Sequence, residues 1–146
     1  MKRLVLALSV LALAGTAASA DPIAERQAIM KSNGKALKSI AGMAKGAEPF
    51  DADTVMAALK ILSEDAEKID VAALFPKGSE TGGDTTASPK IWEDAAGFQK
   101  AVDKFKADTA DAVAAAPADL DAFKAQFGKV SQNCGTCHET FRLKKG

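Results

Sequence analysis

Residues 117–142, PADLDAFKAQFGKVSQNCGTCHETFR, carry the most informative pattern in the chain. After the opening Pro117, apolar side chains recur at intervals of three and four residues, which is the spacing of one face of an α-helix. These residues are Leu120, Phe123, Phe127, Val130, Cys134, Cys137 and Phe141. The pattern predicts an amphipathic helix that carries both cysteines and His138 on, or at the edge of, its buried face.

Three further segments have helical spacing, and residues that start or stop helices separate them. The first covers residues 23–45. The second starts at Asp51 or Asp53, either of which can cap it, and runs to about residue 69. The third covers about 88–112 and starts with a serine followed by proline, a favourable pair at a helix start. The expected buried stripes are Met30, Leu37, Ile40 and Ala44, then Val55, Leu59, Leu62, Ala66 and Ile69, then Ile91, Ala95, Phe98, Val102, Phe105 and Ala112.

The connections between the helices are mostly short. The exception is residues 75–88, in which one proline and three glycines predict a long loop. High alanine content and the absence of tyrosine favour helix over strand. Four amphipathic helices of about twenty residues predict an all-α protein, an antiparallel up-down-up-down four-helix bundle with the cysteine motif near the C-terminal end of the last helix.

The first twenty residues have the pattern of a secretory signal. Lys2 and Arg3 precede an apolar run, and Ala18-Ser19-Ala20 is the small-x-small sequence that signal peptidases accept. The run is short for a permanent membrane span, although an uncleaved anchor is the alternative. We expect residues 1–20 to be a cleaved signal peptide, and residues 21–146 to form one exported domain in the periplasm.

The charge balance excludes several classes of partner. Without Lys2 and Arg3, 17 basic and 19 acidic side chains remain, a formal charge of −2. This balance provides neither a basic surface for nucleic acid nor a polybasic membrane patch, and no later stretch approaches membrane length. Exposed helix faces leave a homodimer possible.

The segment Cys134-Gly135-Thr136-Cys137-His138 is a haem-attachment signature. Two thiols at this separation match the two haem vinyl groups, and the adjacent imidazole becomes an axial ligand of the iron. Three alternatives fit less well. A thioredoxin-like pair prefers a βαβ setting, a structural zinc site needs four protein ligands, and a disulfide here would close only a tiny loop. The motif predicts one covalently attached haem with its iron.

The sixth ligand of the iron is a separate question, because His138 is the only histidine. The candidates are a methionine, a weaker ligand or an empty position. In an antiparallel bundle, the end of the last helix lies beside the start of the first, which places Met30 at the height of His138. Met43 lies about 20 Å further along the axis, and Met56 opens the second helix at that far end. Met30 is the candidate ligand, and the alternative is a methionine that packs on the porphyrin without bonding to iron.

A haem motif at the end of a four-helix bundle resembles the class II cytochromes c, the cytochrome c′ family. The resemblance covers essentially all of residues 21–146. The matching segments are Arg26-Gln27-Ala28-Ile29-Met30, Leu74-Phe75-Pro76, Pro89-Lys90-Ile91-Trp92 and residues 134–142. Five-coordinate members usually carry a non-ligating leucine or phenylalanine where this chain has Met30. The chain is therefore most similar to the low-spin branch, in which this methionine binds iron.

The resemblance also implies that Arg26 and Trp92 lie near the haem, on the side of its propionates. Arg26 would pair with a propionate bidentately, or is a solvated charge on the helix surface. Trp92 is expected to be a packing residue that lines the pocket. Arg142, one turn after His138, would tune the imidazole by its charge, or is a cation favoured by the helix dipole.

These features together predict a periplasmic electron carrier with a His138/Met30 pair and unidentified redox partner proteins. It is not expected to be an enzyme, because the only histidine is committed to iron. The rival function is a five-coordinate protein that binds nitric oxide or carbon monoxide. The sequence specifies neither the redox potential nor the electron donor and acceptor.

Overall fold

The computed structural model describes residues 21–144, so the signal peptide expected at residues 1–20 lies outside the described part. Within it, four long helices and two short ones follow one another. They are α1 (Pro22–Ala44), α2 (Ala52–Glu67), α3 (Val71–Leu74), α4 (Lys90–Glu93), α5 (Ala95–Ala115) and α6 (Leu120–Phe141). None of the helices in residues 21–144 is long and apolar enough to cross a membrane.

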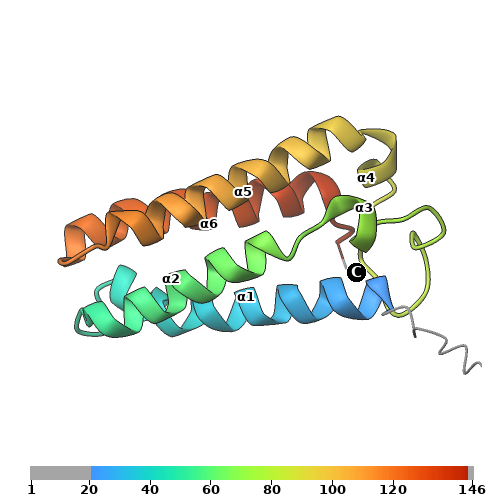
Figure 1. The fold of residues 1–146 in the computed structure, drawn as a ribbon. Coiled ribbons are helices and arrows are strands. Elements are labelled where there is room, and N and C mark those ends of the chain that lie inside the picture. The colour runs from blue at the N-terminus through green and yellow to red at the C-terminus, as the bar shows by residue number, and fades with distance from the viewer. Residues whose placement is uncertain (1–20, 145–146) are drawn as a thin grey trace, which may run out of the picture.

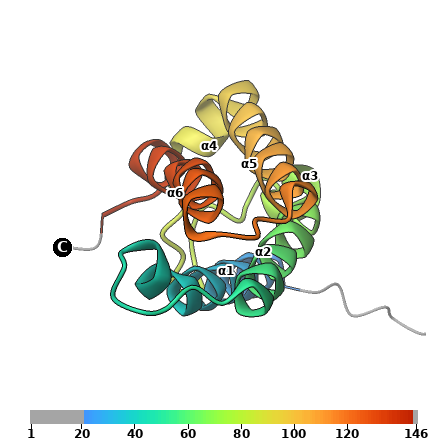
Figure 2. The ribbon, with the colours of Figure 1, turned by 90° about the vertical axis from the view of Figure 1, so that its left-hand side faces the viewer.

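The four long helices form a bundle in which neighbours run antiparallel (Figure 1). Contacts connect α1 with α2, α2 with α5, α5 with α6, and α6 with α1, so the helices close a ring (Figure 2). The predicted up-down-up-down four-helix bundle is therefore confirmed. The contacts between α1 and α6 are the fewest of the four, and this looser side of the bundle is where space remains inside it.

Aspartates start five of the six helices. The side chains of Asp21, Asp51, Asp70, Asp94 and Asp119 each accept a hydrogen bond from a backbone N–H in the first turn. These bonds satisfy donors that have no partner within the helix. Of the two aspartates predicted for the second helix, it is Asp51 that caps. Asp119 sets the start of the last helix, shortly after the proline that opens that segment.

The third predicted helix is interrupted, and its expected continuity was wrong. Asp94 leaves helical geometry, with φ −124° and ψ 59°, and its carboxylate accepts from the Gly97 N–H at 3.1 Å. A Cβ on Gly97 would clash with that carboxylate, so a side chain at this position would displace the cap. The new helix begins at Ala95, which is exposed rather than buried. A second difference is the short helix α3, which the sequence did not predict.

The core follows the predicted stripes, with one shift in α1. There the buried apolar residues are Ile23, Ile29, Ala36, Ile40 and Met43, so the stripe is centred about one residue away from the predicted one. Met30 is 40% exposed, and Met43 belongs to the core. In α6, Phe123, Val130 and Phe141 are buried as expected, whereas both cysteines are half-buried. The phenylalanine and valine side chains of the predicted α6 stripe thus form part of the core, whereas the two cysteines lie at its edge.

Phe123 is the largest fully buried side chain, and its replacement by alanine tests the core. Its ring centroid lies 6.0 Å from that of Phe50 and 5.6 Å from that of Phe127. We expect Phe123→Ala to lower the free energy of unfolding by about 3–5 kcal/mol, because it removes buried contacts and leaves a cavity. Urea unfolding of the haem-loaded protein measures this loss. Ile61→Ala, at a residue 42% exposed, is the control with little expected effect, and an equal loss in both variants would contradict the assignment.

Candidate functional site

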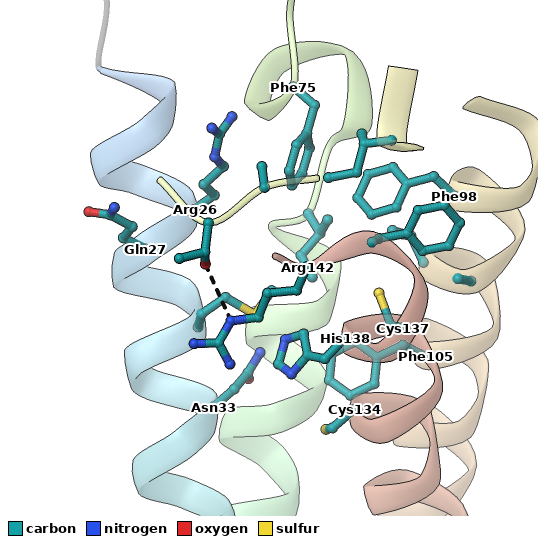
Figure 3. A pocket seen from close by; sticks show the side chains of 18 of the residues that line it. Arg26, Gln27, Asn33, Phe75, Phe98, Phe105, Cys134, Cys137, His138 and Arg142 are labelled. Atoms are coloured by element: carbon teal, nitrogen blue, oxygen red, sulfur yellow. Dashed lines mark hydrogen bonds between the residues drawn. The ribbon is translucent and has the colours of Figure 1, made fainter. Parts of the chain in front are cut away.

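A cavity of about 570 Å³ opens on the loose side of the bundle. Its walls come from α1, from residues 84–87 of the long loop, from α5 and from the last turns of α6 (Figure 3). Its lining is mainly apolar, and its volume falls within the range of small-molecule and cofactor sites. The bundle therefore holds a space suited to a flat apolar group near one end.

The cysteine motif lies on the α6 wall of this cavity. Cys134 and Cys137 are three residues apart on one helix face, both half-buried and both free thiols. His138 lines the same cavity, and its ring projects toward α1 (Figure 3). The structure thus brings together the three side chains that the sequence placed at the edge of the buried face.

The surroundings change the acidity of these groups. Burial raises the pKa of both thiols, and the nearby Cys134 raises that of Cys137 further. Desolvation at the cavity wall lowers the pKa of His138, and the positive charge of Arg142 lowers it again. At neutral pH the two cysteines are therefore protonated thiols and the imidazole is in the neutral form that binds metals.

The α1 wall of the cavity carries Met30. Its side chain lines the cavity together with that of His138, whereas Met43 and Met56 do not. Met43 is buried in the core, and Met56 packs against the core from its edge. Of these three methionines, Met30 alone shares a cavity with the cysteine motif.

Arg26 lines the cavity, but it donates its hydrogen bonds to the end of α3 and to the long loop. It is only 5% exposed, so the interpretation as a solvated surface charge was wrong. Its Nη1 donates to the carbonyl of Leu74 and to Ser79 Oγ, and its Nη2 donates to the carbonyl of Ser79 and to Thr85 Oγ1, at 2.6–3.0 Å. Four of its five donors are thus engaged. A bidentate pair with a propionate would require Arg26 to give up some of these bonds.

Trp92 lies one layer behind the cavity. Its Nε1 donates to the carbonyl of Phe75 at 3.0 Å, and its ring packs edge-on against Phe75, which does line the cavity. The expectation that Trp92 itself lines the pocket was therefore wrong, because α4 turns its side chain onto Phe75. Trp92 supports a wall residue instead.

Arg142 lines the cavity where α6 ends. Its Nε donates to Thr86 Oγ1 at 3.3 Å, which joins the end of α6 to the loop (Figure 3). Next to it, the backbone N–H of Ser88 donates to the carbonyl of Phe141. The two contacts hold the loop against the helix that bears the motif.

Two buried asparagines line the cavity and were missed by the sequence analysis. Asn133 Nδ2 donates to Asp108 Oδ2 at 2.6 Å and to the Lys129 carbonyl at 3.0 Å. Asn33 is 6% exposed, and its Oδ1 has no hydrogen-bond partner. The available signal was a polar residue within an otherwise apolar helical stripe, three residues after Met30.

The cavity fits the predicted haem. Two free thiols and a neutral imidazole stand on one wall, and the lining is mainly apolar. Within residues 21–144 no group of three His, Cys, Asp or Glu side chains is placed to hold a metal ion directly.

Comparisons with known proteins agree with this site. Residues 21–142 match the family described as Cytochrome C'. A cytochrome c′ of Rhodopseudomonas palustris is 45% identical over 128 residues, which cover 88% of this chain and 86% of that protein. A cytochrome c-556 of Agrobacterium tumefaciens is 37% identical over 126 residues, or 86% of this chain and all of that protein.

The solved structures include a cytochrome c′ from Rhodopseudomonas palustris, with a TM-score of 0.79 and 44% identity. That likeness covers 86% of this chain and 98% of the other. Family match, sequence identity and fold therefore agree with one another and with the cavity. The chain belongs to the cytochrome c′ family of class II cytochromes, and it is a c-type cytochrome with one covalently attached haem.

Proposed function

We propose that the protein is an electron carrier whose haem is attached to Cys134 and Cys137, with His138 and Met30 as the two axial ligands of the iron. One observation carries this proposal: a thioether on α1 and an imidazole on α6 line the same cavity. When bound, the haem supplies a one-electron couple, and a histidine/methionine pair is the ligand set of many electron-transfer cytochromes.

The rest of the site holds the group and limits access to it. Phe98, Phe105 and Phe141 give the cavity apolar walls that exclude water. Arg142 lies close enough to His138 to lower the pKa of the imidazole, and its bond to Thr86 keeps the loop closed over that end. These residues fix the surroundings of the cofactor, on which its potential depends.

The proposal extends to the setting of the protein. Residues 1–20 would be removed as a signal peptide, and residues 21–146 would work in the periplasm as one domain. The partners would be redox proteins that are not yet identified, and no step of the proposed activity makes or breaks bonds in a substrate.

Binding of a small gas on open iron is the second candidate function. The name of the 45% identical relative favours it, as do the names of the solved structures. One of these structures, 33% identical with a TM-score of 0.75, is a nitric oxide complex of a mutant of cytochrome c prime from Alcaligenes xylosoxidans. The relatives thus favour the second function, and the cavity-facing thioether of Met30 favours the first.

Replacement of Met30 decides between the two. We expect the purified haem-loaded protein to give low-spin, six-coordinate absorption bands in both oxidation states. Met30→Ala is expected to convert these to high-spin, five-coordinate bands, because no other thioether of residues 21–144 lines the cavity. The reduction potential should fall with the loss of the methionine ligand.

Met43→Ala is the matched control, since it removes a methionine from the same helix away from the cavity. It is expected to leave the spectrum unchanged. High-spin bands in the unmodified protein, or identical spectra of Met30→Ala and the unmodified protein, would overturn the methionine assignment and favour the gas-binding candidate in its place.

A further inference from the structure

Asn33 is a buried amide whose presence the stability of the fold does not explain. It lies on the buried stripe of α1, between the apolar positions Ile29 and Ala36, and it is 6% exposed. Its Oδ1 is buried without a hydrogen-bond partner. Such an unpartnered group is destabilising, and an apolar side chain of similar shape would avoid that cost. The chain therefore places a polar group here at the expense of stability.

The position of Asn33 points to the cavity. It lines the cavity, and in Figure 3 its amide extends from α1 toward the wall that bears His138. Residues three apart on a helix are neighbours on its surface, so Asn33 lies beside Met30. A hydrogen-bonding amide thus stands next to the side chain that faces the iron position from α1.

The other polar side chains around the cavity are engaged elsewhere or lie at its rim. Arg26 uses four donors on the loop, and Asn133 donates to Asp108 and Lys129. Lys31 and Arg142 are exposed. Asn33 is therefore the buried amide on the α1 wall for which no internal partner is present among the described residues.

We propose that Asn33 is the hydrogen-bond donor for a small ligand that takes the position of Met30 on the iron. The class of ligand is a diatomic gas or a small anion such as cyanide, which binds iron at one end and offers lone pairs at the other. An amide provides two N–H donors, and in Figure 3 the nitrogen end of the Asn33 amide is the end that points toward His138, so these donors face such lone pairs. The inference rests on the proposed function in needing haem held by the cysteine motif.

The test uses haem-loaded protein with the Met30→Ala change, which opens the iron position whether or not methionine occupies it. In the ferrous form with carbon monoxide bound, adding Asn33→Leu is expected to raise the C–O stretching frequency, because a donor near the oxygen lowers it. In the ferric form, the dissociation constant for cyanide is expected to rise roughly 2- to 10-fold, the equivalent of one lost hydrogen bond.

Met30→Ala/Ser32→Ala is the control, a polar-to-apolar change one residue away whose side chain does not line the cavity. It should match Met30→Ala in both measurements. Met30→Ala/Asn33→Ala repeats the test with a small side chain in case leucine prevents haem loading. An unchanged stretching frequency and cyanide affinity in the Asn33 variants would overturn the inference. Failure of the proposed function would be seen in a different measurement: the unmodified protein and Met30→Ala would give equal absorption spectra.

Discussion

Replacing Arg26 by methionine is expected to lower the free energy of unfolding by about 2–4 kcal/mol and to loosen the loop over the cavity. Arg26 is buried and donates four hydrogen bonds, two of them to Ser79 and one each to Leu74 and Thr85. Methionine retains most of the apolar stem but leaves these acceptors without donors. Unsatisfied partners of a charged group are among the more costly losses in a folded protein.

The measurement is urea unfolding of the haem-loaded variant, with limited proteolysis of residues 76–86 as the local readout. Arg26→Lys is the informative second variant, since one ammonium group cannot reproduce the planar fork that reaches Ser79 and Thr85 together. It should recover only part of the loss.

Arg26→Met also allows a pH test. Burial lowers the pKa of Arg26, while Asp21 and then Glu80 act in the opposite direction, yet a guanidinium stays protonated throughout the accessible range. The destabilisation should therefore be the same at pH 6 and pH 8. A loss below about 1 kcal/mol, or loop cleavage at the unmodified rate, would contradict the role given to these bonds.

Periodicity and caps predicted most of this fold because both are local. The spacing of apolar residues located the four long helices, and for the second of them the sequence also identified the capping aspartate, Asp51. The break at Asp94 was missed because the apolar spacing continues across it. Two helices meet there, and what marks their junction is the side chain of Asp94, which accepts a hydrogen bond from the Gly97 N–H and caps the second helix.

The candidate site was predictable to the extent that it depends on short spacing or on bundle geometry. The cysteine motif is five consecutive residues, and the height of Met30 follows from antiparallel packing and the rise of a helix. The contacts of Arg26 span 48 to 59 residues and depend on the path of a loop without periodicity. Trp92 was misplaced for the same reason, since the turn at α4 sets where its ring goes.

Replacing both cysteines by alanine is expected to abolish covalent haem attachment. The two thiols lie on the cavity wall with no disulfide between them, so each is available to form a thioether. Purified Cys134→Ala/Cys137→Ala should have, under denaturing conditions, the mass of the polypeptide alone. The unmodified protein should have that mass plus one haem. Ser131→Ala, one turn before Cys134 on α6, is the control and should carry a full haem.

The same variant separates the role of the thioethers from that of the cavity. His138 and the apolar walls remain, so some haem would still be held without a bond, and it would be lost in denaturant. If denatured unmodified protein carried no haem, the attachment would be wrong, and a mass two hydrogens below that of the dithiol would point to a disulfide instead. Because burial raises the pKa of both thiols, they are protonated near pH 7 and poorly nucleophilic toward disulfides. That chemistry suits groups held for attachment more than a pair that exchanges disulfides.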